Sequence, residues 1–397
     1  MKEIMREEII QEAKKNKVVE RNIPHDLITT DILTRLPVKC LLKFKCVSKE
    51  WNSTISSAQF AKLHLRSSIS NPYAPPRSTC IIQSLDGLFT LNYEDCDNDG
   101  SIVSRGDGDY APVNDTGNRR NLVFNDFRIW DHWAHIVGSC DGLVCLNLDI
   151  DFFYIWNPSI RKWRETEGPF RFYSKFWEFN YIWGFGHVSS IDDYKIVEAI
   201  GDVLSDKLMA YVFTLKTRAW RRIGVLEGVV CRPTKGVLVN ETLHWAMTLP
   251  TPKEDWRIVA FDLVEETFHE IPHPKLGDRS KPFFLSCMGG CLSLYWENND
   301  KIEEIWMLKQ YGDWDSWMKR YQWKGNVDLY EKSNRAQFFG FTRTGKFLMH
   351  RHGEKLLLVD PNQIPFEFFK ISECAVELDA ASYTESLISP FSTAETP

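Results

Sequence analysis

The 397-residue sequence has no long apolar run. No window approaches the roughly 20 consecutive apolar residues that a membrane-spanning helix needs. The first 22 residues alternate Lys and Arg with Glu and contain no apolar core, so we expect neither a secretory signal nor a transit peptide. The ten cysteines are then expected to be reduced. These absences predict a protein of the cytoplasm or nucleus with no membrane partner.

Sequence signatures of catalysis are also missing. The sequence contains no phosphate-binding Gly-x-x-x-x-Gly-Lys-Ser/Thr loop, and residues 138–142 (Gly-Ser-Cys-Asp-Gly) lack the spacing of a hydrolase elbow and instead predict a hairpin turn. Residues 95–100 resemble the start of a calcium loop, but Gly106 stands where the bidentate Glu is needed, so we interpret 94–120 as a long flexible insertion. We therefore expect no catalytic residue, no metal and no cofactor.

The charge is distributed unevenly along the chain. The first 70 residues carry 13 Lys and Arg against 8 Asp and Glu, so the totals of 48 and 54 leave 35 and 46 for the remainder. The head is near +5 and the body near −11. A general nucleic-acid-binding protein needs a basic stripe on its main domain, so this division argues against nucleic acid as a partner.

Residues 23–66 predict three short helices. Pro24 suits a first helical turn and Pro37 ends the helix, and the segment between them has apolar residues at spacings of three to five, namely Leu27, Ile28, Ile32, Leu33 and Leu36. A second helix is expected from Val38 to about Lys45. Ser48 has the chemistry to cap a third helix that carries Trp51 and Ile55.

These helices hold more apolar residues than they are able to bury against each other. A segment this short buries a low fraction of its surface, so part of its apolar face should be covered by a partner. The alternative is an ordinary amphipathic helical hairpin that packs on the rest of the chain.

Beyond about residue 75 the sequence changes to short alternating runs of Val, Ile, Phe, Tyr and Trp between Gly, Asn and Asp. Strands that end in a polar turn are followed six residues later by an aromatic residue, as in Asn157 with Trp163 and Thr214 with Trp220. With Trp317, the aromatic positions are 163, 220, 268, 317 and 366, a period near 50. This is kelch-like spacing and predicts a β-propeller of five or six blades. The alternative is an irregular β-sandwich.

The helical segment resembles the F-box, in which a proline-started helix, a Leu-Pro break, paired leucines and a Val-x-Lys-x-Trp stretch dock on the Skp adaptor. One departure is Ile23, where Leu is usual. The resemblance implies that the adaptor is bound by Ile23, Pro24, Leu27, Ile32, Leu33, Leu36, Pro37, Leu41, Leu42, Val47 and Trp51.

The β-rich region resembles the type 1 F-box-associated domain of plant F-box/kelch-like proteins. The residues that carry this resemblance lie at 156–159 (Trp-Asn-Pro-Ser) with Arg161, 184–186 (Gly-Phe-Gly), 192–197, 243–245 (Leu-His-Trp), 261–263, 305–308 with 316–317, and 383–390. The fold class expected is thus a short three-helix F-box followed by an all-β kelch-like propeller. The domains expected are a charged tail (1–22), the F-box (23–68), the propeller (75–390) and a C-terminal tail (391–397).

By this resemblance the chain is similar to non-catalytic substrate receptors of Skp–cullin–F-box ubiquitin ligases. The implied partners are the Skp adaptor, cullin and RING subunits through it, and an unknown protein target. Arg171, Tyr173 and Trp177 in the aromatic and basic stretch 170–181 are candidates for target binding, although core strands also produce such composition. The competing function is a propeller scaffold that acts without a ligase. A third alternative is a kelch-type sugar oxidase, but such an enzyme needs copper ligands that are not arranged in this sequence.

Overall fold

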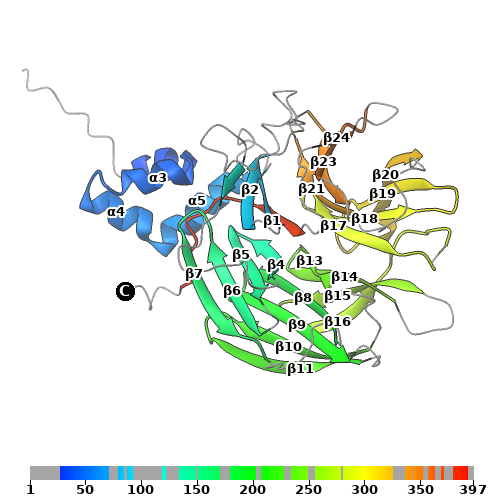
Figure 1. Cartoon of the computed structure of the whole chain (residues 1–397). Coiled ribbons are helices and arrows are strands. Elements are labelled where there is room, and N and C mark those ends of the chain that lie inside the picture. Colours follow the sequence, from blue (N-terminus) through cyan, green and yellow to red (C-terminus); the bar gives the residue numbers. More distant parts are fainter. Residues whose placement is uncertain are drawn as a thin grey trace, which may run out of the picture. The chain divides into compact units, whose positions relative to one another are not determined.

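The computed structural model describes residues 27–70, 79–84, 87–92, 119–121, 134–148, 151–169, 179–202, 207–227, 234–248, 255–278, 280–324, 336–342, 344–351, 356–362, 368–370 and 379–391. The chain divides into two compact units, Met1–Asn71 and Pro72–Pro397. The first is helical in its described part and the second consists of β-sheets (Figure 1). The predicted fold class is confirmed.

The described part of the helical unit contains a π turn, a 3-10 turn and three α-helices: η1 (Ile28–Ile32), η2 (Leu33–Arg35), α3 (Val38–Phe44), α4 (Lys49–Ser56) and α5 (Ala58–Ser70). Leu36 leaves the helical conformation, with ψ of 145°, because the following Pro37 disfavours it. The predicted cap is present, since Ser48 Oγ accepts a hydrogen bond from Trp51 N at 3.0 Å.

Two features of this unit differ from the sequence prediction. We expected a regular helix of about three turns before Pro37, but its described part combines a π turn with a 3-10 turn. We also named no separate helix after Ile55, where Ser57 Oγ accepts a hydrogen bond from Phe60 N at 3.1 Å near the start of α5. Apolar spacing does not distinguish i→i+3, i→i+4 and i→i+5 hydrogen bonding, which explains the first difference.

The described strands of the second unit form six sheets. In chain order these sheets contain β1 (Thr79–Ser84), β2 (Gly87–Asn92), β3 (Arg119–Asn121) and β25 (Asp379–Tyr383); β4 (Ala134–Cys140), β5 (Leu143–Leu148), β6 (Phe152–Asn157) and β7 (Lys162–Glu167); β8 (Phe179–Val188), β9 (Asp193–Asp202), β10 (Lys207–Thr214), β11 (Ala219–Glu227) and β12 (Thr234–Lys235); β13 (Val237–Val239), β14 (Thr242–Thr248), β15 (Trp256–Asp262) and β16 (Thr267–Ile271); β17 (Phe283–Met288), β18 (Cys291–Glu297), β19 (Ile302–Leu308) and β20 (Trp317–Lys324); and β21 (Ala336–Phe341), β22 (Phe347–Arg351), β23 (Leu356–Val359) and β24 (Phe368–Lys370).

The sheets follow one another as the blades of a propeller. The innermost strands touch in the order β25, β4, β8, β13, β17 and β21, and β21 touches β25 again. Apolar layers fill the spaces between neighbouring sheets, such as the one that Leu208, Val212, Leu243 and Phe261 form between the β8–β11 and β13–β16 strands. Arg119 and Arg120, which we had placed in a flexible insertion, belong to strand β3.

The predicted aromatic repeat corresponds to one place in each blade. Trp163, Trp220 and Phe268 start the fourth strand of their sheets, and they face Trp156, Phe213 and Phe261 on the third strand. Trp317 faces Leu308 in the same way after a longer turn with a 3-10 segment, η5 (Trp314–Ser316). Phe366 lies outside the described residues.

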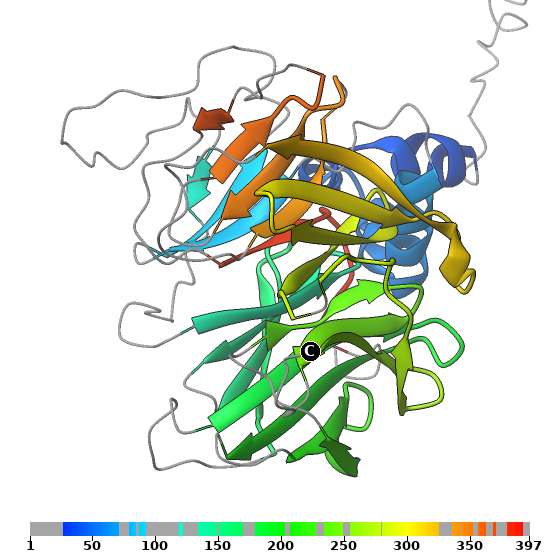
Figure 2. The same cartoon turned by 90° about the vertical axis from the view of Figure 1, so that its right-hand side faces the viewer.

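The ring closes between the two ends of the propeller sequence. The C-terminal strand β25 pairs antiparallel with β1, and both views place it beside that strand (Figures 1 and 2). Lys235 Nζ donates to Asp379 Oδ1 and to the Ala380 carbonyl, both at 2.5 Å, and Asp379 Oδ2 accepts from Ile136 N at 3.0 Å. Burial works against ionisation of Asp379, but Lys235, together with His135 and the Ile136 N–H, holds the pKa of that carboxyl below its usual range.

The segment after β25 is fastened to the β4–β7 sheet. Asn157, fully buried, donates through Nδ2 to the Ser386 carbonyl (3.0 Å), Ser386 Oγ (3.2 Å) and the Ile388 carbonyl (2.7 Å). The hydroxyls of Ser159 and Tyr383 lie 2.6 Å apart. Two motifs separated by about 230 residues, Trp-Asn-Pro-Ser and the terminal 383–390 stretch, therefore form one clasp.

Two further motifs allow neighbouring blades to approach closely. A Cβ atom at Gly184 would lie 2.6 Å from Leu243 Cδ1, and one at Gly186 would lie 2.6 Å from Leu263 Cδ1, so the next sheet packs directly on this strand. His244 is buried, donates from Nδ1 to the Val237 carbonyl and accepts at Nε2 from the Tyr311 hydroxyl, each at 2.9 Å. Burial lowers the pKa of His244 to about 4, which keeps the ring neutral for this role.

Candidate functional site

The helical unit has a small core of its own. Leu33, Leu41 and Ile55 are at most 1% exposed, and Val38 and Phe60 are nearly as buried. His64 Nε2 donates to the Leu36 carbonyl at 2.8 Å, so α5 holds the break between η2 and α3 in place. This core fixes the relative positions of the short helices.

Five large apolar side chains in the described part of this unit remain outside that core. Two of them lie on α5, Leu63 (37% exposed) and Ile69 (53%), and the other three come before α4. Leu27 is 49% exposed, Ile32 45% and Val47 60%. The backbone N–H of Leu33 bonds the Ile28 carbonyl five residues earlier, so each turn here holds more residues than an α-helical turn. This brings Leu27 and Ile32, also five residues apart, closer to the same side of the turn than a regular α-helix would, in which five residues rotate by about 140° beyond a full turn. We call Leu27, Ile32 and Val47 the apolar docking surface.

The predicted adaptor residues therefore fall into three groups. Leu27, Ile32, Val47 and Pro37 are exposed, whereas Leu36, Leu42 and Trp51 are partly buried. Leu33 and Leu41 are 0% exposed and support the helices from inside, so their contact with an adaptor stays a prediction. Ile23 and Pro24 lie outside the described residues.

The described part of the helical unit is rich in cations. Residues 27–70 contain seven Lys and Arg but only two acidic residues, Asp31 and Glu50. Lys39 and Lys43 are both exposed on α3 and stand four residues apart, an arrangement that weakens an isolated helix by repulsion. The described part of the unit thus combines unburied apolar groups with net positive charge.

The second candidate is one face of the propeller, formed by the turns that join the first strand to the second and the third to the fourth in each sheet. We call it the turn face. Backbone in the left-handed region concentrates there, at Asp141, Arg161, Asp192, Arg218, Asn240, Glu241 and Glu266. Residues in this conformation close tight hairpins, so these turns are short and well defined.

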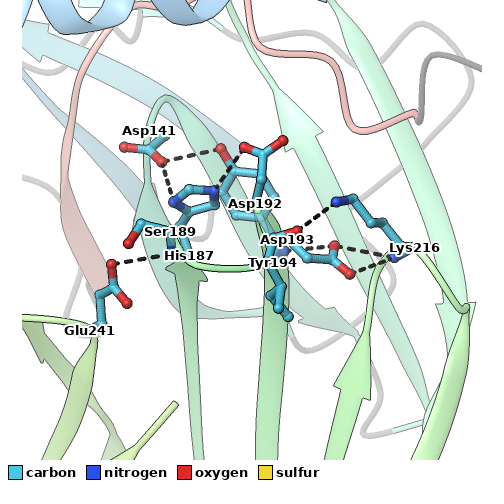
Figure 3. Close-up of polar contacts among 9 residues, drawn as sticks. Asp141, His187, Ser189, Asp192, Asp193, Tyr194, Lys216 and Glu241 are labelled. Carbon is cyan, nitrogen blue, oxygen red and sulfur yellow. Dashed lines mark hydrogen bonds and ion pairs between the residues drawn. The ribbon is translucent and has the colours of Figure 1, made fainter. Parts of the chain in front are cut away.

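A polar network joins four of these turns near His187, as Figure 3 shows. His187 Nδ1 lies 3.6 Å from Asp141 Oδ2 of the preceding sheet, and Nε2 lies 3.4 Å from Asp192 Oδ1. The Tyr194 hydroxyl donates to Asp141 Oδ2 at 3.2 Å, and its ring lies against the His187 ring with centroids 4.7 Å apart. Burial, followed by Asp141, raises the pKa of Tyr194.

The same network holds the β8–β9 turn from both sides. Glu241 Oε1 accepts from Ser189 N at 3.2 Å, and Lys216 Nζ donates to the Ile191 carbonyl at 2.7 Å (Figure 3). Asp193 accepts from the backbone N–H of Tyr194 at 2.8 Å and of Lys216 at 3.2 Å. Burial raises the pKa of Asp193, against the effect of these two donors.

A third unusual group lies inside the propeller. Glu198 on β9 is 1% exposed and faces Trp183 and Tyr211 on the neighbouring strands. Burial, aided by the charge of Asp151, raises the pKa of Glu198 to about 8, so it is uncharged at neutral pH. Burial also raises the pKa values of Cys145 and Tyr181 near it.

The remaining predictions have these outcomes. Arg171, Tyr173 and Trp177 lie outside the described residues, between β7 and β8. Within the described ranges, no group of three or more His, Cys, Asp or Glu side chains is placed to hold a metal ion. No helix in the described part of the chain has the length and apolar character to cross a membrane.

The convergence on His187 was missed from the sequence. The stretch 192–197 and the Asp141-Gly142 turn were each noted there, but 45 residues separate His187 from Gly142. Only the stacking of two blades joins them.

Comparison with known proteins shows similarity over both units. Residues 22–63 match the F-box domain family, and residues 116–389 match the F-box associated beta propeller domain family. An F-box/kelch-repeat protein of Arabidopsis thaliana is 28% identical over 339 residues, which cover 81% of this chain and 84% of the relative. F-box protein CPR1 of Arabidopsis thaliana is 24% identical over 401 residues, which cover 92% of this chain and 88% of the relative.

Proposed function

Because the chain belongs to the family of F-box proteins with an F-box associated beta propeller domain, we propose that it is the substrate-recognition subunit of a Skp–cullin–F-box ubiquitin ligase. In this function the helical unit binds the Skp adaptor, and through it the cullin and RING subunits. The propeller binds a protein target. The site of action is the cytoplasm or nucleus.

One observation supports adaptor docking most directly, the apolar docking surface. Leu27, Ile32 and Val47 remain about half exposed or more although the unit has a closed core. Complete burial of a large apolar side chain stabilises by about 1.5–3 kcal/mol, so a partner that covers these side chains is bound more tightly.

The chain contributes proximity to the reaction. It holds a target close to a ubiquitin-conjugating enzyme that the complex recruits, which raises the effective concentration of the target lysines. No step in this mechanism requires a catalytic side chain of the propeller.

Substitution of the docking surface tests the proposal. We expect Val47→Asp to weaken binding to a plant Skp adaptor at least about 100-fold, because the interface would bury an unpaired carboxylate. Ile69→Asp is the matched control, since Ile69 on α5 is 53% exposed, comparable to Val47. Isothermal titration calorimetry with the purified adaptor measures both dissociation constants.

The outcomes separate the two candidate functions. Loss of binding in Val47→Asp alone supports the ligase receptor. If the unsubstituted chain does not bind the adaptor, or if Val47→Asp binds as well as it does, the docking assignment is wrong and a propeller scaffold independent of the ligase is the better description.

A further inference from the structure

Two apolar side chains protrude from the turn face of neighbouring blades. Ile191 in the β8–β9 turn is 49% exposed, and Val264 in the β15–β16 turn is 44% exposed. Turns favour Gly, Asn, Asp, Ser and Pro, whereas β-branched apolar residues gain nothing from such positions. Neither side chain is required for closing its hairpin.

Glu241 connects the two turns. Its carboxylate accepts from Ser189 N at 3.2 Å, two residues before Ile191, and its carbonyl accepts from Leu263 N at 3.1 Å, one residue before Val264. Ile191 and Val264 therefore belong to one continuous surface that spans two blades.

Both turns are held rigidly. Lys216 Nζ binds the Ile191 carbonyl, and Asp262 Oδ1 accepts from Val264 N at 2.7 Å and from Glu265 N at 2.9 Å. Lys195, which is 4% exposed, donates to the Leu263 carbonyl at 2.5 Å and pairs with Glu266 at 2.8 Å. A surface that is already ordered loses little conformational entropy when a partner binds.

The hairpin beside these turns is basic. Residues 216–222 (Lys-Thr-Arg-Ala-Trp-Arg-Arg) contain four cations and no anion, although residues 71–397 carry 35 Lys and Arg against 46 Asp and Glu. Lys216, Arg218, Arg221 and Arg222 are all exposed, and Arg221 contacts Glu266 next to the Val264 turn. An acidic domain thus places a cluster of cations next to two apolar side chains.

We propose that this tip surface, made of Ile191, Val264, Lys216, Arg218 and Arg221, binds a target segment in which apolar side chains lie beside Asp or Glu residues. That the bound protein is a ubiquitylation target rests on the proposed function. The apolar groups supply the contact area, and the cations select acidic neighbours and speed association.

The charges favour a protein segment over phosphates. Asp192, Glu241 and Glu265 lie among the same turns, and they would repel a nucleic-acid backbone or a layer of anionic headgroups. A peptide segment has only a few charges, and these are able to lie beside the cations and away from the anions of such a mixed surface.

The test uses the full chain in complex with the Skp adaptor and a phage-displayed library of random 16-residue peptides. We expect enriched peptides to combine apolar residues with Asp or Glu. Their dissociation constants should rise about tenfold or more in Ile191→Ser and in Arg218→Glu. The matched controls are Val225→Ser on β11, which is 46% exposed, and Arg320→Glu on the exposed edge of β20.

Three results would overturn the proposal. They are no enrichment, enriched peptides without acidic residues, and peptides that bind Ile191→Ser as tightly as the unsubstituted chain. Binding of duplex DNA or of phosphatidylserine vesicles that disappears in Arg218→Glu would assign the surface to phosphate groups instead. Failure of adaptor binding refutes the ligase function but not this surface, since peptide selection then proceeds with the full chain alone.

Discussion

Replacing Glu198 by Gln should stabilise the propeller, and the gain should grow with pH. Glu198 is 1% exposed on β9, and burial raises its pKa to about 8 from an ordinary value of 4.5. In the folded chain the carboxyl is therefore protonated below pH 8, whereas in the unfolded chain it ionises above about pH 4.5. Gln has nearly the same shape and never ionises.

The magnitude follows from proton linkage. Each pH unit between the two pKa values costs about 1.4 kcal/mol of folding free energy, because the unfolded state gains by releasing the proton. The stability that the neutral carboxyl supports is complete below pH 4.5 and is lost as pH rises toward 8. Glu198→Gln should thus match the natural chain near pH 4.5, exceed it by about 3 kcal/mol at pH 7, and by about 5 kcal/mol above pH 8.

Urea unfolding at several values between pH 5 and pH 9 measures the difference. Of the 15 tryptophans, 14 follow residue 71, so tryptophan fluorescence reports on the propeller. Glu227→Gln is the control, since the Glu227 side chain on β11 is 73% exposed. A stability difference between Glu198→Gln and the natural chain that stays constant with pH, or a variant that is less stable at pH 8, would refute the reasoning.

Three other substitutions test the packing. Leu41→Ala should lower the free energy of unfolding of the helical unit by about 2–5 kcal/mol, because Leu41 is 0% exposed. Circular dichroism should show a lower melting temperature of this unit in Leu41→Ala and a nearly unchanged one in Val47→Ala. Asn157→Ala should lower the free energy of unfolding by about 2–4 kcal/mol, because it removes the side chain that donates to the buried Ser386 and Ile388 carbonyls. Proteolysis near the C-terminus should then be faster. An unchanged rate of proteolysis would contradict the clasp. Gly184→Val should lower the free energy of unfolding, measured by calorimetry, by about 1–3 kcal/mol, because the added side chain forces Leu243 away. An unchanged free energy of unfolding would show that the two blades separate easily.

Local chemistry was readable from the sequence wherever it acts over a few residues. The Ser48 cap, the break at Pro37 and the hairpin turn at Asp141-Gly142 were all predicted, and each depends on neighbouring residues. The aromatic period was also readable, because every blade repeats the same pairing of its third and fourth strands.

Exposure was less predictable. Leu33 and Ile32 are adjacent and equally apolar, yet Leu33 is 0% exposed and Ile32 45%. The π turn decides which of them enters the core, and hydrophobic spacing contains no information on that choice. Only the tertiary structure therefore showed which of the predicted docking residues are exposed and which support them from the core.

The sequence by itself determined which elements form: helices with more apolar surface than they bury, followed by sheets of repeated strand pairs with polar turns. Only the tertiary structure decided which distant residues meet. Ring closure brings Asn157 to Ser386, and blade stacking brings Asp141 to His187 and Lys195 to Glu266. Strand and turn propensities act between neighbours in the chain, whereas these contacts depend on how each sheet packs on the next, which no local pattern encodes.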